Sequence, residues 1–315
     1  MRKKFKKILI TGSSGTIGTA LFEKLLKQGY KVIGFDKKPN EWHLYLNKLT
    51  IIGNLLSKKD IRKLPTNFDL IIHLAANARV YNLVLNPSLA LENIVTTYNI
   101  LEFARVNNIK AFIFSSSREV YGNSGKAVSS EKEVDIRLSE SPYMASKISG
   151  ESLTYAYSKC FGIDYIILRL SNVYGRYDAN DRFIPLLIRQ MKKNQPVFIY
   201  GKDKILDFTY IDDCVDGIIK SIECFPKVKN DTFNIASGKG YFLLEVAHML
   251  KEFLKSEGKI LIRKSQIGEV TRYVADISKA KILLRYKPRH SLRAGIISTI
   301  SWYNNYYQNT DLRKQ

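Results

Sequence analysis

The chain has 315 residues, 45% of them hydrophobic, and a formal net charge of +21 at pH 7. This length suits one large domain or two modest ones with a packed core. No apolar run reaches the ~18 residues of a membrane span, and residues 8–10 are too short for the apolar part of a signal peptide. We therefore expect a mature cytoplasmic protein with no membrane partner.

The positive charge and the cysteines indicate no special chemistry. The lysines are scattered along the whole chain rather than gathered in a basic block, so a solvated surface is favoured over a nucleic-acid partner. The three cysteines, Cys160, Cys214 and Cys224, have neither metal-ligand spacing nor a disulfide framework. We expect no metal site.

The first half of the chain alternates short β-rich runs with longer helical patterns. Strands are predicted at 7–10, 31–35, 50–52, 70–74, 111–114 and 165–168, and helices at 17–28, 57–64, 87–107 and 142–160. Such alternation predicts an α/β fold with a doubly wound parallel sheet. Beyond residue 170 we predict helices at 182–193, 210–224, 242–255, 278–284 and 292–307, and a strand at 197–200. This second region is expected to be smaller and interleaved with the first.

A glycine-rich turn follows the first strand. Gly12, Gly15 and Gly18 have the spacing G-x-x-G-x-x-G, and Thr16 and Ile17 open the next helix. Glycine lets the backbone approach a pyrophosphate, and the helix N-terminus supplies N–H groups and a positive dipole. In this strand–turn–helix context the pattern predicts a dinucleotide site; an ordinary tight turn is the alternative.

Asp36 ends the second predicted strand. A carboxylate there accepts hydrogen bonds from a ribose diol and repels a 2′-phosphate, which favours NAD over NADP. Lys37 and Lys38 follow directly and would soften that repulsion. The alternative is an aspartate that caps a turn.

Tyr143 and Lys147 are spaced i, i+4 and lie on one face of a predicted helix. A lysine there favours the phenolate of the tyrosine, which can then exchange a proton with a sugar hydroxyl. The pair alone is a weak signal, since many such pairs lie on surfaces. The glycine turn and the serine run 115–117, which closes an apolar run, strengthen it.

Further motifs extend over nearly the whole chain. They are H-x-A-A at 73–76, N-x-x-x-T-x-N-x-L-E at 93–102, S-S-x-x-V-Y-G at 116–122, R-x-x-N-V-Y-G at 169–175 and A-D-I-S-K-A at 275–280. With the glycine turn and Y-x-x-x-K, they resemble the extended short-chain dehydrogenase/reductases. Within these, the chain is similar to the NAD-dependent nucleotide-sugar epimerase/dehydratase family and resembles UDP-sugar 4-epimerases.

The resemblance implies a Rossmann domain at 1–170, joined by part of 210–240, and a substrate-binding domain formed mostly by 171–315. It also implies a homodimer that pairs the helices at 87–107 and 142–160. The cofactor implied is NAD, and Leu74, Ala75, Ala76 and Asn93 are expected to line its binding site as well.

The family also implies roles for single residues. Tyr143 would be the catalytic base, Lys147 would hold the nicotinamide ribose and lower the tyrosine pKa, and Ser117 would bind the substrate oxygen. Which serine of the run faces the sugar stays open. Asn172 resembles the asparagine that contacts the substrate diphosphate.

Two positions bear on the reaction. Arg118 stands where 4,6-dehydratases carry a catalytic aspartate, which argues against dehydration. Glu119 matches a glutamate of UDP-glucuronate decarboxylases, or else forms an ion pair with Arg118. Tyr273 replaces the arginine of those decarboxylases, and a large residue there narrows the sugar pocket.

The expected diphosphate arginine is missing, because Leu206 occupies its position. Arg272, Lys202 or Lys204 are the candidate substitutes. Arg176 and Arg182 could face a substrate carboxylate, or be solvated arginines near a helix start.

The sequence therefore predicts an NAD-dependent UDP-sugar 4-epimerase acting on UDP-glucose/UDP-galactose or on UDP-glucuronate/UDP-galacturonate. One alternative is UDP-glucuronate decarboxylation or another nucleotide-sugar dehydratase. A non-catalytic NAD-sensing or RNA-binding scaffold is the alternative of another class, and the intact Ser117, Tyr143 and Lys147 argue against it.

Overall fold

The computed structural model describes residues 4–311. The first three residues of the basic start lie outside this range. The elements of the first half are β1 (Lys7–Thr11), α1 (Thr16–Lys27), β2 (Lys31–Asp36), α2 (Leu44–Asn47), β3 (Thr50–Ile52), α3 (Lys58–Ile61), β4 (Leu70–His73), α4 (Val80–Leu85), α5 (Ser88–Val106), β5 (Ala111–Ser117), α6 (Pro142–Phe161) and β6 (Asp164–Leu170). All predicted strands of this half are confirmed. The helix predicted at 57–64 is wrong in length, since only one turn forms there.

The elements of the second half are β7 (Asn172–Tyr174), α7 (Phe183–Met191), β8 (Val197–Tyr200), β9 (Ile205–Tyr210), α8 (Ile211–Val228), β10 (Asp231–Ile235), β11 (Gly240–Phe242), α9 (Leu243–Leu254), β12 (Ile260–Arg263), β13 (Arg272–Tyr273), a single wide turn η3 (Ala280–Leu284) and α10 (Leu292–Asp311). The predicted helices are found; at 278–284 two α-helical residues lead into η3, which is a π-helix. Six of these strands were not predicted: β7, β9, β10, β11, β12 and β13.

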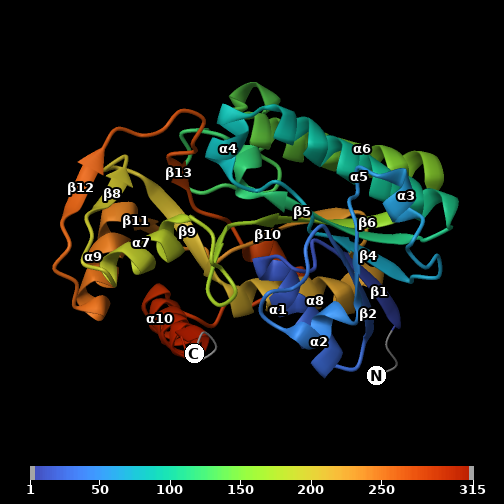
Figure 1. Cartoon of the computed structure of the whole chain (residues 1–315). Helices are drawn as coiled ribbons and strands as arrows, with labels where there is room; N and C mark the ends of the chain where they lie inside the picture. The colour runs from blue at the N-terminus through green and yellow to red at the C-terminus, as the bar shows by residue number, and fades with distance from the viewer. Residues whose placement is uncertain (1–3, 312–315) are drawn as a thin grey trace.

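A seven-stranded parallel sheet forms the centre, in the order β10-β6-β5-β4-β1-β2-β3. Its middle strands are buried on both faces, so they read as continuous apolar runs rather than alternating ones. Helices α5 and α6 pack together on one face, and α1 and α8 on the other (Figure 1). This is the predicted doubly wound α/β fold.

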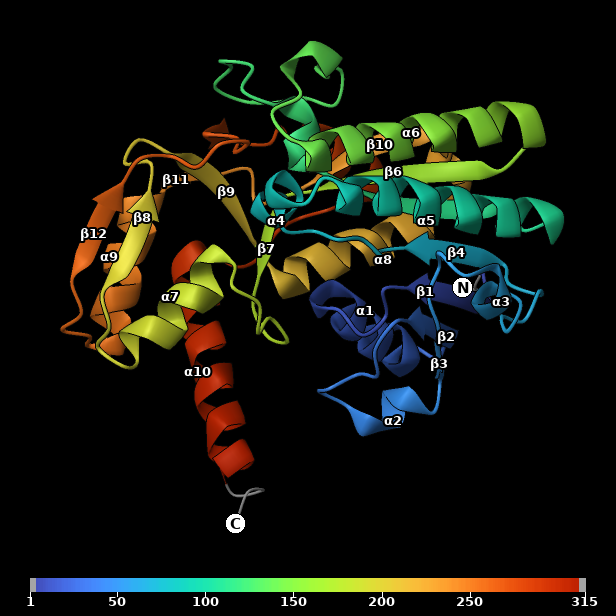
Figure 2. The same ribbon diagram turned by 45° about the horizontal axis from the view of Figure 1, so that its top comes forward.

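The smaller part carries two short sheets, one of β11, β9, β13 and β7 and one of β12 and β8. It lies to one side of the central sheet together with α7 and α9 (Figure 2). Within residues 4–311, no helix combines the length and the hydropathy needed to cross a bilayer. The order of β3, β2, β1, β4 and β5 reverses direction between β1 and β4, which is where ligands bind in open α/β sheets.

Candidate active site

The turn between β1 and α1 has the backbone that the glycine pattern predicts. Gly12 has a φ of +73°, and a Cβ on it would lie 2.6 Å from the backbone nitrogen of Ala75. A Cβ on Gly18 would lie 2.1 Å from the carbonyl oxygen of Gly12. Side chains are therefore excluded at both positions, while Gly15 at the start of α1 lines a cavity. The helix N-terminus at this cavity favours an anion such as a pyrophosphate.

Asp36 lies in the wall of a cavity of about 390 Å³ beside the glycine turn. Its Oδ2 accepts a hydrogen bond from the Ser14 backbone nitrogen at 2.9 Å, and its Oδ1 accepts one from the Lys38 backbone nitrogen at 3.1 Å. These bonds fix the carboxylate and leave lone pairs for a ribose diol. Lys37 forms an ion pair with Glu92 at 3.5 Å. The same wall holds further predicted cofactor residues, namely Gly12, Gly15, Thr16, Leu74, Ala75, Ala76 and Asn93.

Asn93 of α5 also fixes the loop that follows β4. Its Oδ1 accepts from the backbone nitrogen of Asn77 at 2.7 Å, and its Nδ2 donates to the Asn77 carbonyl at 3.0 Å. The Nδ2 also lies 3.2 Å from the Ser146 hydroxyl of α6. Asn93 therefore joins α5, α6 and the cofactor-side loop into one wall.

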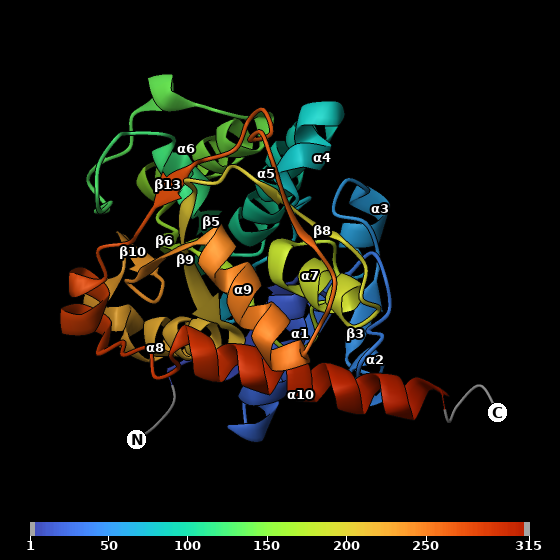
Figure 3. The same ribbon diagram turned by 90° about the vertical axis from the view of Figure 1, so that its left-hand side faces the viewer.

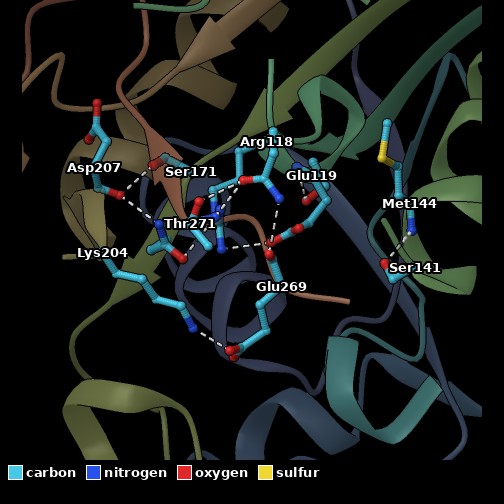
Figure 4. A network of polar contacts seen from close by, with 12 residues as sticks. Arg118, Glu119, Ser141, Met144, Ser171, Lys204, Asp207, Glu269 and Thr271 are labelled. Carbon is cyan, nitrogen blue, oxygen red and sulfur yellow. Dashed lines mark hydrogen bonds and ion pairs between the residues drawn. The ribbon is translucent and has the colours of Figure 1, made fainter. Parts of the chain in front are cut away.

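Tyr143 and Lys147 lie in the first turns of α6, where the sequence placed them on one face. Ser141 caps this helix, since its hydroxyl accepts from the Met144 backbone nitrogen at 3.2 Å (Figure 4). The Lys147 ammonium donates to the Ser115 carbonyl at 2.8 Å and lies 5.8 Å from the centre of the Tyr143 ring. Both side chains are buried against the end of β5.

Burial dominates the electrostatics of this pair. It raises the pKa of the Tyr143 phenol, opposed mainly by a hydrogen bond with Ser117 and by the charge of Arg182. It lowers the pKa of Lys147 to about 8, opposed by Glu151. In the protein without NAD the pKa of the Tyr143 phenol is therefore raised, because desolvation outweighs the neighbouring charges. The expected lowering by Lys147 together with the positive nicotinamide stays a prediction.

The three serines 115–117 have different hydrogen-bond partners. Ser115 contributes the carbonyl that binds Lys147, and the Ser116 hydroxyl donates to Glu151 at 2.5 Å. The Ser117 hydroxyl is hydrogen-bonded to Tyr143 and accepts from the Glu119 backbone nitrogen at 3.2 Å. Among the three, Ser117 is the serine placed to act with the phenol.

Two cavities meet at Tyr143. One, of about 510 Å³, runs from Gly12 and Gly15 to Lys147. The other, of about 440 Å³, is lined by Arg118, Glu119 and Asn172. Ser117 and Tyr143 line both. The phenol can therefore reach a molecule in the second cavity that also touches a cofactor in the first.

Charged side chains of Arg118, Glu119, Lys204 and Glu269 line the second cavity and lie near one another (Figure 4). Arg118 pairs with Glu119 at 2.6 Å and donates from Nε to the Asn172 side-chain oxygen at 3.0 Å. Burial raises the pKa of Glu119, and Arg118 opposes the rise. Lys204 forms an ion pair with Glu269 at the same cavity. Within the described chain, Glu119 Oε2 and Arg118 Nη1 are buried and have no hydrogen-bond partner.

Residues 8–236 match the model of the NAD dependent epimerase/dehydratase family. The chain belongs to this family. It is 34% identical to an uncharacterized UDP-glucose epimerase of Bacillus subtilis, over 96% of this chain and 99% of the relative.

Two crystal structures are similar over their whole length. One is UDP-glucuronic acid 4-epimerase from Bacillus cereus in complex with UDP-glucuronic acid and NAD, with 34% identity, a TM-score of 0.88, and 96% and 100% of the two chains covered. The other is UDP-glucose 4-epimerase with UDP-glucose from Thermotoga maritima, with 28% identity, a TM-score of 0.88, and 96% and 99% covered.

Three of the predicted substrate residues lie away from the Tyr143 cavity. Arg176 forms an ion pair with Asp212 beside another cavity. Arg272 is exposed and lines a surface groove. Tyr273 is 1% exposed, and the Arg118 guanidinium lies 5.9 Å from its ring centre. The structure places Tyr273 behind Arg118 instead of in the cavity wall, so any effect on a sugar would act through Arg118.

Two of the proposed cations lie at the site, and two aromatic residues reach it without a motif that marks them. Of the cations proposed to replace the family arginine, Lys204 lines the second cavity. Arg182 lines both cavities at Tyr143 and forms no ion pair within residues 4–311. Trp42 and Tyr177 line the cofactor cavity, although they are far apart in the sequence. Only tertiary structure brings them there.

Proposed function

We propose that this family member is an NAD-dependent UDP-sugar 4-epimerase that works through a transient 4-keto sugar. The observation that carries the proposal is that Ser117 and Tyr143 line both cavities, with Lys147 beside them on the cofactor side. UDP-glucose/UDP-galactose is the first candidate pair of substrates. The similar structures in complex with UDP-glucose and with UDP-glucuronic acid support a UDP-sugar ligand.

The residues of the first cavity fit NAD. The glycine turn would hold the pyrophosphate, Asp36 the adenosine ribose and Lys147 the nicotinamide ribose, since its ammonium has donors beyond the one that binds Ser115. Bound there, NAD would supply a hydride acceptor for C4 of the sugar and a positive charge that favours the phenolate.

Proton transfer is assigned to the protein. Tyr143 accepts the proton of the C4 hydroxyl as the carbonyl forms, and Ser117 hydrogen-bonds the same oxygen. After the sugar turns about its diphosphate bonds, Tyr143 gives the proton back. Asn172 and Lys204 would bind the diphosphate from the opposite wall. Because the proton and the hydride both return, the reaction needs no other reactant.

A uronate is the second candidate substrate, and Arg182 is the observation that favours it. This arginine stands beside Tyr143 with no ion pair within the described residues, whereas Arg79 and Arg189 are both paired with Asp181. An unpaired guanidinium is suited to a carboxylate. Glu119 opposes this, because it places a second carboxyl group at the same cavity.

The test is to incubate the purified protein with UDP-glucose and with UDP-glucuronate and to read the products by NMR. We expect the C4 epimer with all carbons kept and, in deuterated water, no deuterium at C4. Release of CO₂ with a UDP-pentose would instead assign decarboxylation and make Glu119 catalytic. No reaction with any nucleotide-sugar by NAD-loaded protein would contradict the proposal.

We also propose that the enzyme is a cytoplasmic homodimer joined through α5 and α6. Large apolar side chains are exposed on α5, with Leu91 at 62% and Tyr98 at 44%. Paired long helices would bury this surface.

A further inference from the structure

Four aromatic rings from three separate segments meet beside the cofactor cavity. The ring centres of Trp42 and Trp302 are 5.1 Å apart, and those of Trp42 and Tyr306 are 4.9 Å apart. Tyr177 completes the group at 5.9 Å from Trp42 and 5.6 Å from Trp302. We call these four residues the aromatic cluster. Its tryptophans are the only two in the sequence.

The cluster ties the smaller part of the molecule to the nucleotide-binding sheet. Helix α10 starts in the smaller part, where the Tyr174 hydroxyl donates to the Leu292 carbonyl at 3.3 Å. It then runs along the base of the molecule toward the side that carries α2 (Figure 3). Trp302 and Tyr306 lie in its second half, against the loop that follows β2 and carries Trp42.

Tyr177 is the central residue of this junction. Its carbonyl accepts from the Thr16 hydroxyl at the start of α1 at 3.0 Å. Its own hydroxyl donates to Glu23 of α1 at 3.0 Å and lies 2.7 Å from His43 Nε2. Its φ is +66°, a conformation that is unfavourable for a non-glycine residue and persists where the surroundings hold it.

Trp42 and Tyr177 also line the cavity that contains Asp36 and the glycine turn. A dinucleotide seated there would lie between the loop of Trp42 and the loop of Tyr177. Both loops are held by the same cluster, so a movement that separates either loop from a bound dinucleotide also breaks ring contacts of the cluster.

We propose that the aromatic cluster is a clasp that retains NAD between turnovers, with Tyr177 and Trp302 as its positioning residues. This rests on the proposed function. An epimerase returns the hydride to the sugar that supplied it, so its NAD is never consumed and gains nothing from rapid exchange. The packing of Trp302 on Trp42 and Tyr177 would slow the opening of both loops.

The clasp is tested on purified NAD-loaded protein without any sugar. Samples are passed into NAD-free buffer, and the remaining NAD is released by acid and counted per protein chain over time. We expect Trp302→Ala to release NAD about fivefold faster than the wild type, because a packed aromatic pair contributes about 1 kcal/mol beyond its buried area. Activity lost in this way should return when NAD is added back.

Tyr177→Phe keeps the ring and removes the bonds to Glu23 and His43, so it should release NAD faster while folding normally. Tyr155→Ala is the matched control, since it breaks another aromatic pair, with Tyr165 at 5.3 Å, outside the cofactor cavity. It should keep wild-type NAD retention and activity. If folded Trp302→Ala and Tyr177→Phe both retain NAD like the wild type, the clasp is refuted. If the wild type itself holds no NAD, the proposed function fails instead.

Discussion

Tyr143 is the residue on which the proposed chemistry depends. Replacement by phenylalanine keeps the buried ring but removes the group that exchanges the proton. General acid–base catalysis contributes about 10²–10⁴-fold, so Tyr143→Phe should lose that much turnover and still hold NAD. Steady-state rates and a count of bound NAD check this. Tyr155→Phe is the control, and near-normal activity of Tyr143→Phe would remove the tyrosine from the mechanism.

Glu119 is expected to act on substrate choice. It is buried beside Arg118, and its negative charge opposes a second carboxylate in the same cavity. Glu119→Gln leaves Arg118 without its counter-ion. The ratio of kcat/KM for UDP-glucuronate over UDP-glucose should therefore rise about tenfold, which equals ~1.4 kcal/mol. An unchanged ratio, measured with both substrates on the same preparation, would show that Glu119 does not face the sugar.

Lys147 should make stability depend on pH. Its folded pKa of about 8 lies below the unfolded value of about 10.4, so the unfolded chain binds more protons between them. Stability then rises with pH in this window. Relative to Lys147→Met, the wild type should gain about 1 kcal/mol of unfolding free energy between pH 7 and pH 9. Urea unfolding at both pH values measures it, and equal pH slopes for the two proteins would contradict the lowered pKa.

The sequence predicted the local parts of the site better than the distant ones. The glycine turn, Asp36 and the Tyr143–Lys147 pair sit in short segments whose spacing carries their geometry. Which serine meets Tyr143 was open, because it depends on how β5 lies against α6. The position of Tyr273 behind Arg118 could not be predicted either, because it depends on the pairing of β13 with β9.

At the scale of elements, the long periodic helices and the strands of the first half were predicted, whereas six strands beyond residue 170 were not. Strand β9 shows why. It contains Asp207, whose carboxylate is fully buried and accepts from the backbone nitrogens of Ser237 and Gly238 at 3.0 and 2.8 Å. A buried aspartate interrupts the apolar pattern of a strand, and its partners lie about thirty residues away. Nothing in the sequence near Asp207 indicates that its buried carboxylate will find these hydrogen-bond donors.

The N-terminal cap of α6 is expected to position the catalytic tyrosine. Ser141 caps the helix and thereby sets the first turn, which carries Tyr143. Loss of an N-cap typically costs about 1 kcal/mol. Ser141→Ala should lower the free energy of unfolding by about that amount and reduce kcat more than NAD binding. Ser57→Ala, at the equivalent cap of the short α3, is the control that lowers stability alone. Equal activity of the two variants would show that the cap does not position the phenol.

At the scale of the whole molecule, the cofactor cavity is built by both parts of the chain. Asp36 and the glycine turn come from the central sheet, while Tyr177, Ala179 and Asn180 come from the segment between β7 and α7. The aromatic cluster and the Tyr303 hydrogen bond to the Asp178 carbonyl hold these parts together. Binding of NAD should therefore stabilise the two parts together, since a ligand that contacts both favours the state in which they are packed.

The proposed dimer can be tested at the exposed apolar residues of α5. Leu91 and Tyr98 are seven residues apart on α5, so they lie on one face of the helix, and both are exposed. A charge buried between two α5–α6 pairs would have no partner and would oppose association. The double variant Leu91→Glu, Tyr98→Glu should sediment as a monomer of 36.1 kDa, and the wild type at twice that mass. Ile282→Glu is the control, an equally apolar residue that is 74% exposed on η3. A wild type that sediments at 36.1 kDa would refute the dimer, and a double variant that still dimerises would place the interface elsewhere.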